Sequence, residues 1–500
     1  MSRSAVRAER RYEPVIGLEI HVQLRTKSKM FCRCDNRADD ARPNELTCPV
    51  CLGLPGTLPV ANRTAVEWAL KAAIALGCEI PKRSKFDRKQ YFYPDLPKGY
   101  QISQYDKPLG GPGTFEFDVP EDGKVVTKKV GITRLHLEED AGKLTHPKGA
   151  DYSLVDLNRA GTPLAEIVTE PDFRSPAEAK RFLQELRRLM RYLDISDADM
   201  EKGHLRADAN VSVRPAGSKK LGTKTELKNL NSFRFVEKGL AAEIDRQTGL
   251  LERGEAVVHE TRGYDEDRGA TVSQRGKEEA HDYRYFPEPD IPPLEPRTMG
   301  LVRLREDLPE LPVTRRRRYR DEYGLSESDA EYLIDEPLNA NYFEERIEEA
   351  IIGEDAIKDA KEAAGAIAKM LTGPYAALLK SGKKQLFAEL GIEAGVVSDL
   401  ARLLVNGRIS WQGAKEILST DDALHFRERR EALLKRYQPV ATDDIEAIID
   451  QAIKDNPKPA ADFKSGNENA RQVIVGSVMK ATKGAADAKA VLELITKKLR

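Results

Sequence analysis

The stretch V-I-G-L-E-I-H-V-Q-L, from Val15 to Leu24, decides the fold prediction because two alternating patterns share it. Every even position from 16 to 24 carries an aliphatic residue, whereas Glu19, His21 and Gln23 occupy odd positions. Side chains of a β-strand alternate between its two faces, so one face is apolar and the other is polar. Residues two apart on a strand stand about 7 Å from each other, which brings Glu19 close to His21. A half-buried strand with a wet outer face explains this single segment as well as a binding site does.

Two further segments repeat the same design. Residues 204–214 alternate small aliphatic residues with polar ones, among them Arg206 and Asp208. Residues 130–137 form a third predicted strand, which runs directly into three consecutive acids, Glu138, Glu139 and Asp140. Three strands that direct acids, imidazoles and guanidinium groups away from an apolar base predict the floor of a polar cavity.

The composition describes a large soluble protein. The 500 residues carry a formal net charge of −1, 33% of them are charged, and the mean hydropathy is −0.54. This length exceeds what one core supports, so two to four domains are expected. No window approaches the roughly 18 apolar residues of a membrane helix, and the charged N-terminus lacks the apolar centre of a signal peptide. We therefore expect a cytoplasmic protein with no membrane contact, whose nucleic-acid binding, if any, depends on local basic patches.

Composition divides the chain into three predicted domains. Residues 12–295 mix short strands, Gly/Pro turns and a few helices, which indicates an α+β domain. The proline-rich run at 286–296 continues neither a helix nor a strand and marks the end of this domain. Residues 296–405 show a helical pattern, and residues 406–500 form a further set of alanine- and lysine-rich helices.

Two helices of the first domain have clear N-terminal signals. Asn62 is predicted to cap a helix that ends at Gly77. Ser175 and Glu178 are spaced as a capping box, with a proline at the first helical position. The helix that follows carries an apolar stripe of Phe182, Leu186, Leu189 and Leu193.

Four of the five cysteines lie within the twenty residues 32–51, as Cys32, Cys34, Cys48 and Cys51. A C-P-x-C-x-G turn directs both of its sulfurs toward one point, and four thiolates hold Zn²⁺ in a closed tetrahedral site. The spacing predicts a structural zinc knuckle inserted at 32–51. The alternative is a turn that has kept its cysteines without a metal. The fifth cysteine, Cys78, lies past a helix end and is expected to pack in the core.

Six aromatic residues gather between Phe86 and Tyr105, interleaved with polar residues and turn-forming prolines. Core packing would require apolar residues at a regular period, and this segment has no such period. Tyrosines near cations suit stacking on a base or on a ribose-phosphate, so Tyr91, Tyr93 and Lys98 are candidate cofactor-binding residues. A loop packed across the sheet is the alternative.

The segment L-H-L-E-E-D-A-G-K, residues 135–143, ends a strand in acids that suit a cation. Glu138 and Glu139, together with Glu19, His21 and Asp208, are candidate ligands of Mg²⁺, which bridges protein carboxylates to phosphate oxygens. A solvated acidic turn is the alternative. The chain contains no P-loop, nucleophile elbow, glutaminase cysteine motif or kinase motif set, so any ATP site is of a less common type.

A series of long motifs resembles the B-subunit family of aspartyl/glutamyl-tRNA(Asn/Gln) amidotransferases, from end to end of the chain. The matching stretches are G-L-E-I-H-V-Q-L (17–24), C-P-V-C-L-G-L-P-G (48–56), Y-F-Y-P-D-L-P-K-G-Y-Q-I-S-Q (91–104), H-L-E-E-D-A-G-K (136–143), D-L-N-R-A-G-T-P-L-A-E-I-V (156–168), E-L-K-N-L-N-S-F (226–233), D-Y-R-Y-F-P-E-P-D (282–290) and G-S-V-M-K-A-T-K-G (476–484). One departure is local: relatives often carry an Asn-Trp pair where this chain reads A-I-A-K-M at 366–370.

The resemblance implies one component of a three-part carbon–nitrogen ligase that uses ATP to activate a misacylated tRNA. It implies an α+β cradle domain built on an antiparallel sheet, then an all-α middle domain and a small all-α tail that binds tRNA. The amidase (glutaminase) component, or A-subunit, would supply ammonia from glutamine, and the small C-subunit would complete the heterotrimer. The family's magnesium and phosphate positions match Glu19, His21, Glu138, Glu139 and Asp208, and its four cysteines match those at 32–51.

Further roles follow from the reaction that the resemblance implies. Lys98 and Arg206 are candidate phosphate clamps, since phosphoryl transfer needs charge neutralisation more than covalent chemistry. Arg471, Lys480 and Lys483 are candidate phosphate contacts of the tail. Two other function classes stay open: a metal-dependent phosphoesterase or nuclease built on the same acids, and a non-catalytic tRNA-binding scaffold.

Overall fold

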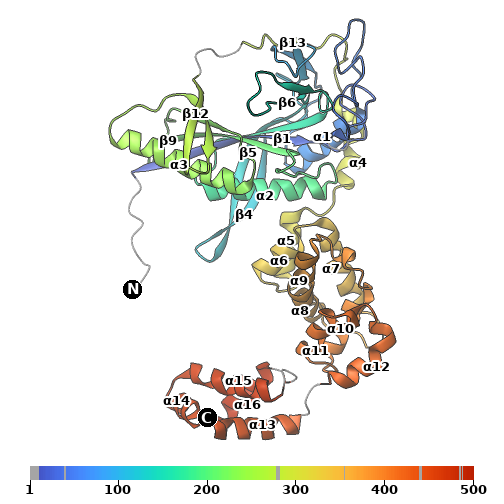
Figure 1. Cartoon of the computed structure of the whole chain (residues 1–500), viewed down its shortest axis with the longest axis vertical. Helices are drawn as coiled ribbons and strands as arrows, with labels where there is room; N and C mark the ends of the chain where they lie inside the picture. The colour runs from blue at the N-terminus through green and yellow to red at the C-terminus, as the bar shows by residue number, and fades with distance from the viewer. Residues whose placement is uncertain are drawn as a thin grey trace. The chain divides into compact units, whose positions relative to one another are not determined.

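The computed structural model describes residues 11–38, 41–276, 282–353, 355–438, 442–482, 486 and 488–499. The chain divides into two compact units, Met1–Val313 and Thr314–Arg500. The first unit carries the strands and the second is helical (Figure 1).

An eight-stranded sheet forms the centre of the N-terminal unit, in the spatial order β12-β11-β10-β9-β1-β8-β5-β4 (Figure 1). Neighbouring strands are antiparallel except β10 and β11, which are parallel. This sheet confirms the α+β prediction. Its strands are β1 (Tyr12–Gln23), β4 (Gly113–Glu121), β5 (Lys124–Glu139), β8 (Pro163–Thr169), β9 (Leu205–Pro215), β10 (Thr225–Lys228), β11 (Glu260–Asp265) and β12 (Ala270–Gly276).

The sheet has one apolar and one polar face, as the alternation predicts. On β1, Ile16, Leu18, Ile20 and Val22 are at most 1% exposed and belong to the main hydrophobic core. The odd-numbered Glu19, His21 and Gln23 are only partly buried. Leu205, Ala207, Ala209 and Val211 of β9 join the same core, so both predicted strands present their polar side chains on the opposite face.

Three helices cover the apolar face: α1 (Arg63–Ala75), α2 (Pro176–Tyr192) and α3 (Phe233–Glu252). Figure 1 shows α2 and α3 side by side. The Asn62 side chain caps α1, and the Ser175 hydroxyl accepts from the N–H of Glu178 at 3.2 Å. The Glu178 carboxylate accepts from the N–H of Arg174, whereas the predicted capping box would have it accept from the N–H of Ser175. The predicted apolar stripe of α2 is buried in the core.

Two small sheets lie outside the large one. The first contains β13 (Phe286–Pro287), β2 (Asp87–Gln90) and β3 (Tyr100–Ser103), and the second pairs β6 (Lys143–Thr145) with β7 (Leu154–Asp156). The polypeptide then continues as a 3₁₀ turn, η2 (Pro296–Met299), and α4 (Leu301–Glu306).

The second unit is helical, in agreement with the prediction for the chain after the proline-rich run. Its longer elements are α5 (Pro312–Asp321), which starts in the first unit, α6 (Glu327–Leu333), α7 (Pro337–Ala350), α8 (Ala360–Met370), the π-helical η3 (Leu371–Tyr375), α9 (Ala376–Gly382), α10 (Gly395–Val405), α11 (Trp411–Leu418), α12 (Phe426–Arg436), α13 (Thr442–Asp455), α14 (Pro457–Lys464), α15 (Arg471–Ala481) and α16 (Ala488–Leu499). Short 3₁₀ turns connect some of them: η4 (Phe387–Leu390), η5 (Asp421–Ala423) and η6 (Glu468–Ala470).

Two separate hydrophobic clusters underlie these helices. The first runs from Tyr319 to Leu433 and the second from Ile445 to Leu499. The first cluster therefore extends past the boundary predicted at residue 405. In the segment A-I-A-K-M at 366–370, the Lys369 ammonium lies 4.0 Å from the centroid of the Trp411 ring. The division of the chain into three domains at 295 and 405 stays a prediction.

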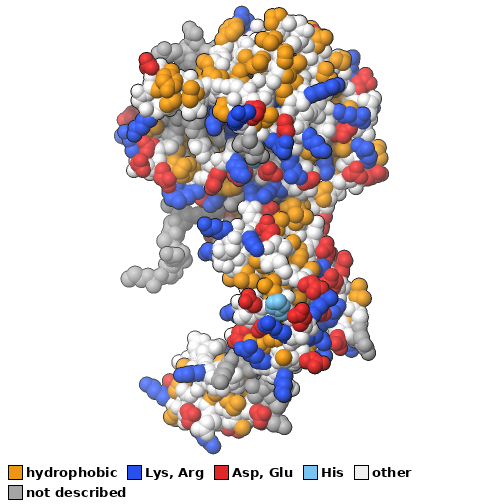
Figure 2. Space-filling view, turned by 45° about the vertical axis from the view of Figure 1, so that its right-hand side comes forward, with side chains coloured by type: hydrophobic (Ala, Val, Ile, Leu, Met, Phe, Trp, Pro, Cys, Tyr) orange, Lys and Arg blue, Asp and Glu red, His pale blue; other side chains and the backbone are white. Residues whose placement is uncertain are grey.

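Acidic and basic side chains are interspersed on the face shown in Figure 2, in keeping with the net charge of −1. No helix in the described ranges is both long enough and apolar enough to cross a membrane.

Candidate active site

One row of polar side chains crosses the sheet on the face opposite the core. The register pairs Arg206 of β9 with His21 of β1, His21 with Glu166 of β8, and Glu166 with His136 of β5. Directly paired residues of neighbouring strands point to the same face, so four strands contribute to this row. Glu138 stands two residues beyond His136 on β5 and shares that face.

His21, Glu138 and Glu166 form a compact group whose ligand atoms all lie within 4.8 Å of one another. His21 Nε2 lies 3.4 Å from Glu138 Oε1 and 3.4 Å from Glu166 Oε2. His136 Nε2 lies 3.1 Å from Glu166 Oε2 and 3.7 Å from Glu138 Oε2. The Ser103 hydroxyl donates to Glu138 Oε2 at 3.2 Å. Two carboxylates thus lie between two imidazoles, an arrangement that could hold a metal ion.

The imidazoles and carboxylates of this group stabilise one another's charged forms. Burial by itself lowers the pKa of His21, but hydrogen bonds and charge from Glu138 and Glu166 outweigh burial and raise that pKa to about 10. Burial also opposes protonation of His136, and the same two carboxylates raise its pKa. Burial favours the neutral form of each carboxyl, yet the two imidazoles hold the pKa of Glu138 and of Glu166 well below the usual range. At neutral pH the His21 proton therefore compensates carboxylate charge.

Glu19 and Asp208 stand opposite each other on β1 and β9, in the neighbouring row of the same face. Asn210 Nδ2 donates to Glu19 Oε1 at 3.0 Å. Lys228 Nζ of β10 lies 3.3 Å from Asp208 Oδ2. Each acid therefore has a partner of its own, and their sharing of one cation with Glu138 stays a prediction.

A cavity of about 580 Å³ lies over this polar face. It gathers the predicted site residues His21, Glu138 and Asp208 with the predicted clamp Arg206 and with Tyr91. Arg206 donates to Asp140 Oδ2 at 2.9 Å. Further charged residues also line the cavity: Lys89, Asp140, Glu201, Lys202 and Lys228. Acids that suit a metal ion and cations that suit phosphate oxygens thus share one enclosure.

Glu139 and Lys98 lie elsewhere, because consecutive residues of a strand point to opposite faces. The N–H of Ile102 donates to Glu139 Oε1 at 2.9 Å, and the Lys98 ammonium pairs with the same carboxylate. Both residues line a separate cavity of about 70 Å³, which Cys32 and Cys51 also border. Neither is among the described residues that line the 580 Å³ cavity.

The aromatic segment at 86–105 does not form a single surface. Phe86 belongs to the core, with 1% of its surface exposed. Tyr91 borders the large cavity, where Lys89 Nζ lies 5.7 Å from its ring centroid. Tyr93 is 58% exposed and lines a different, open hollow together with Phe92. Stacking of either tyrosine on a nucleotide stays a prediction.

The sequence prediction misses two members of the central group, His136 and Glu166. His136 precedes Glu138 by two residues, so period-two alternation already places both on one face. Glu166 is the single charged residue of the otherwise apolar strand P-L-A-E-I-V-T. An acid in such a strand is a usable signal, but only the register of β8 between β1 and β5 shows which residues it meets.

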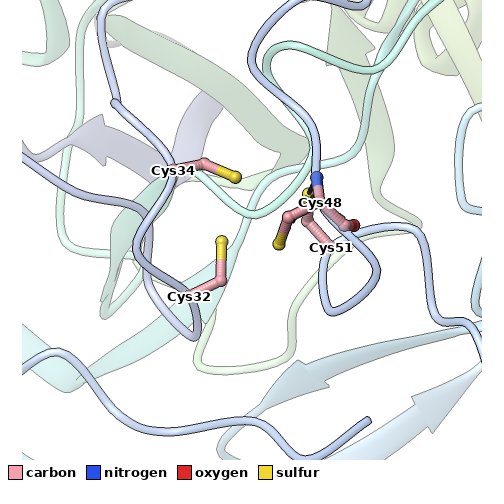
Figure 3. Close-up of side chains that lie close together, drawn as sticks. All are labelled: Cys32, Cys34, Cys48 and Cys51. Carbon is pink, nitrogen blue, oxygen red and sulfur yellow. Dashed lines mark hydrogen bonds between the residues drawn. The ribbon is translucent and has the colours of Figure 1, made fainter.

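Cys32, Cys34, Cys48 and Cys51 lie together, and their sulfur atoms are all within 4.8 Å of one another (Figure 3). The Sγ atoms of Cys48 and Cys51 are 3.9 Å apart, and the N–H of Cys48 donates to Cys51 Sγ at 3.1 Å. Zn–S bonds of about 2.3 Å in a tetrahedron place sulfurs roughly 3.8 Å apart, so the four thiols fit a metal ion. Cys78 is separate from them and packs in the core, as predicted.

Cys51 and Cys34 of this cluster differ in acidity. A hydrogen bond from Cys32, followed by a bond from the backbone of Cys48 and the charge of Lys29, lowers the pKa of Cys51 to about 5 against the opposing effect of burial. Burial, together with the neighbouring sulfurs, raises the pKa of Cys34 to about 11. The Cys51 sulfur is thus favoured in its thiolate form before any metal binds.

Two family models and many curated proteins match this chain. Residues 14–299 match the GatB/GatE catalytic domain, and residues 353–499 match the GatB domain. Proteins of Carboxydothermus hydrogenoformans and Thermoanaerobacter pseudethanolicus are 46% identical to the chain over 496 and 492 residues, covering 98% of the chain and 99% of each protein. A protein of Trichodesmium erythraeum is 45% identical over 505 residues, covering 99% of both chains. All three are named as the B-subunit of aspartyl/glutamyl-tRNA(Asn/Gln) amidotransferase.

Proposed function

Because this chain belongs to the B-subunit family of aspartyl/glutamyl-tRNA(Asn/Gln) amidotransferases, we propose that it performs the ATP-dependent amidation of misacylated tRNA. The substrate is a Glu or Asp residue esterified to tRNA(Gln) or tRNA(Asn). Its side-chain carboxylate attacks the γ-phosphate of ATP and forms an acyl phosphate with release of ADP. Ammonia then displaces phosphate and leaves the amide.

The physical need for this sequence of steps lies in the carboxylate itself. Its negative charge repels a nucleophile, and oxide is a poor leaving group. Phosphorylation converts that oxygen into phosphate, which leaves readily. The protein must therefore neutralise phosphate charge and align the reactants rather than supply a covalent nucleophile.

The single observation that supports this proposal is the 580 Å³ cavity that combines acids with cations. Glu138 and Glu166 present carboxylate oxygens, which Mg²⁺ prefers, and these two residues would hold the ion. Bound there, Mg²⁺ would offset the charge of the phosphates. Arg206 and Lys228 would orient phosphate oxygens from the β9–β10 side of the cavity. Tyr91 would pack against the nucleotide.

His21 takes a different role from that of a direct magnesium ligand in this proposal. Its ring nitrogen lies between Glu138 and Glu166 and carries a proton at neutral pH. It orients both carboxylates and releases its proton when a cation takes over the neutralisation of their charge. Glu19, Glu139 and Asp208 remain candidate residues of the site, of which Asp208 borders the cavity.

The four clustered cysteines would hold a structural Zn²⁺ that fixes the loops at 32–51. The relatives are named as one lettered component of an amidotransferase, which implies a multi-subunit enzyme. We propose two partners: the amidase A-subunit, which releases ammonia from glutamine, and the small C-subunit. A cytoplasmic location suits an enzyme that supplies aminoacyl-tRNA for translation.

We further propose a three-domain chain whose tail, residues 406–500, binds tRNA. Within the tail, Lys480 is exposed on α15, and no side chain of the described residues lies within 4 Å of the position where Gly476 would carry a Cβ. Arg471 instead donates to Thr496 Oγ1 at 3.2 Å and pairs with Glu468, and Lys483 lies outside the described residues. Lys480 is thus the better phosphate contact.

Truncation tests the role of the tail, and the hydrophobic clusters show where to cut. Ending the chain after Gln438 keeps the cluster that reaches Leu433 intact and removes the one at 445–499. With its partner subunits present, the truncated protein should bind tRNA roughly tenfold more weakly and with a shallower salt dependence, because fewer counterions are released. Amide formation on a short aminoacylated acceptor mimic should persist. Unchanged tRNA affinity and salt slope would remove residues 439–500 from the tRNA-binding surface.

The decisive experiment for the reaction itself is Glu138→Gln in the assembled enzyme. The substitution removes a charge with little change of size, so phosphorylation and amidation of Glu-tRNA(Gln) should fall at least about 100-fold. Glutaminase activity of the free amidase partner should be unaffected. Glu79→Gln, at an exposed position of the same unit, is the matched control.

Two outcomes would contradict the proposal. A Glu138→Gln enzyme within about twofold of the unsubstituted rate would remove this carboxylate from the reaction. Metal-dependent phosphoester hydrolysis without ATP-dependent amide formation by the unsubstituted complex would instead favour a phosphoesterase built on the same acids.

A further inference from the structure

Lys29 is a completely buried lysine beside the cysteine cluster, with 0% of its surface exposed. Its ammonium donates to the carbonyl of Leu46 at 2.7 Å and to that of Leu157 at 3.4 Å. It also lies 3.9 Å from Sγ of Cys51. Within the described part of the chain, no carboxylate forms an ion pair with this lysine.

This environment satisfies the N–H groups of Lys29 but not its charge. Carbonyl dipoles accept hydrogen bonds, yet a buried ammonium strongly destabilises a protein unless a nearby anion compensates for it. Among the groups that contact Lys29 in the described residues, only the sulfur of Cys51 can carry a negative charge.

Four thiolates around one Zn²⁺ carry a net charge of −2, so a metal-loaded cluster is itself an anion, and its Cys51 sulfur is buried against Lys29. We propose that Lys29 is the counter-charge of this metal–thiolate cluster, and that it holds the metal in place by offsetting part of the cluster's negative charge. The inference rests on the zinc site proposed above. Lys29 acts here as a positioning residue, since it contacts no substrate.

Lys29 also connects the cluster to the wall of the reaction cavity. Its partner Leu157 begins a loop that leads to Gly161, where an added Cβ would lie 3.5 Å from Lys29 Cδ and 3.6 Å from Cys51 Cβ. The N–H of Gly161 donates to the carbonyl of Asp140 at 2.9 Å, and Asp140 lines the cavity. Loss of the metal would leave the Cys51 sulfur as the remaining counter-charge of the ammonium at the base of this loop. The metal and Lys29 should therefore stabilise the fold more strongly in each other's presence.

Two substitutions separate the charge of Lys29 from its packing. Lys29→Met keeps the length of the side chain and removes both charge and hydrogen bonds. Lys29→Gln removes the charge but keeps an N–H donor for the carbonyls, so it also serves if the methionine variant does not fold. Lys27→Met is the matched control, because Lys27 is exposed and only two residues away.

The measurements are made on the full chain, with and without metal. Release of zinc to a chromogenic chelator should be roughly tenfold faster or more in both Lys29 variants, and unchanged in Lys27→Met. The thermal midpoint should fall in the zinc-loaded Lys29 variants. In chelator-stripped protein the same substitutions should lower the midpoint less or not at all, because only the Cys51 sulfur, and not a cluster of charge −2, then faces the ammonium.

Each result supports or overturns the role of Lys29. A release rate and midpoints of Lys29→Gln equal to those of the unsubstituted chain would show that charge has no role and overturn the proposal. An equal drop in midpoint with and without metal would reduce Lys29 to a packing residue and overturn it as well. Failure to find zinc in the unsubstituted chain would overturn the zinc site itself, whereas normal zinc content with unchanged release overturns only the role of Lys29.

Discussion

The cysteine cluster at 32–51 and the His21–Glu138–Glu166 group are both able to hold a metal ion, yet they are built in opposite ways. The cysteines come from two neighbouring turns, and a buried lysine lies against them. The carboxylates come from two different strands, β5 and β8, and Glu138 and His21 of this group line a cavity of about 580 Å³. A closed set of soft sulfur ligands suits a permanent structural ion, whereas an open set of hard oxygen ligands suits an ion exchanged with its substrate.

The two clusters also differ in how their charge is compensated. A fixed ammonium, which cannot leave, stands beside the thiolates. A proton on His21 stands between the carboxylates, and it can leave when a cation arrives. On the proposed function, the first cluster would keep its metal during turnover, whereas the second would suit a change of occupant.

Substitution of Glu166, which only the structure brings into the site, should have the largest effect. Glu166→Gln removes one of the two carboxylates that meet His21, so amide formation by the assembled enzyme should fall about 100-fold or more. Zinc content and the amidase activity of the partner should be unchanged. Glu170→Gln, at an exposed position just after β8, is the control. Activity near that of the control would show that the carboxylate cluster is structural. The carboxylates and the cysteines would then not differ in role.

Removal of one cysteine should instead change the zinc content and the thermal stability of the protein. Cys48→Ala is expected to reduce bound zinc from about one ion per chain to nearly none. It should also lower the midpoint of the first thermal unfolding transition by roughly 5 °C, because metal binding contributes folding free energy. Metal analysis and calorimetry measure both quantities. Cys78→Ala changes a core cysteine outside the cluster and should leave the zinc content intact. Zinc well below one ion per unsubstituted chain would mean that the cysteines serve another purpose.

The smallest expected effect concerns the pH dependence of stability through His21. Its pKa rises from an ordinary 6.5 to about 10 in the folded protein. A raised folded-state pKa adds stability that is complete below pH 6.5 and is lost as the pH rises to about 10. In buffers without magnesium, the midpoint difference between the unsubstituted chain and His21→Gln should therefore shrink over this window. A constant difference would mean that the proton does not compensate Glu138 and Glu166.

Local sequence patterns predicted much of the fold. Alternation at 15–24 and 204–214 predicted the two faces of β1 and β9, and Asn62 and Ser175 predicted the starts of α1 and α2. These features depend on residues within a few positions of one another, so one sequence suffices to find them. The cysteine cluster was visible for the same reason, since its ligands lie in two short turns.

The sequence predicted only some members of the His21–Glu138–Glu166 group. His21 and Glu138 were predicted from their strands, but the same reasoning grouped Glu139 with them, and the structure places Glu139 on the other face beside Lys98. Glu166 was missed because a lone acid in an apolar strand gives no information about its neighbours. Pairing of β8 between β1 and β5 supplies that information.

By itself, the sequence determined which side chains share a face of each strand and where helices begin, because these properties follow from dihedral geometry over a few residues. Only the tertiary structure decided that Glu166 and His136 join His21, that Asp208 pairs with Lys228, and that Lys29 is buried against Cys51. These contacts depend on strand register and on loops brought together from distant parts of the chain. Such long-range packing is set by the burial of the whole core, which no short segment encodes.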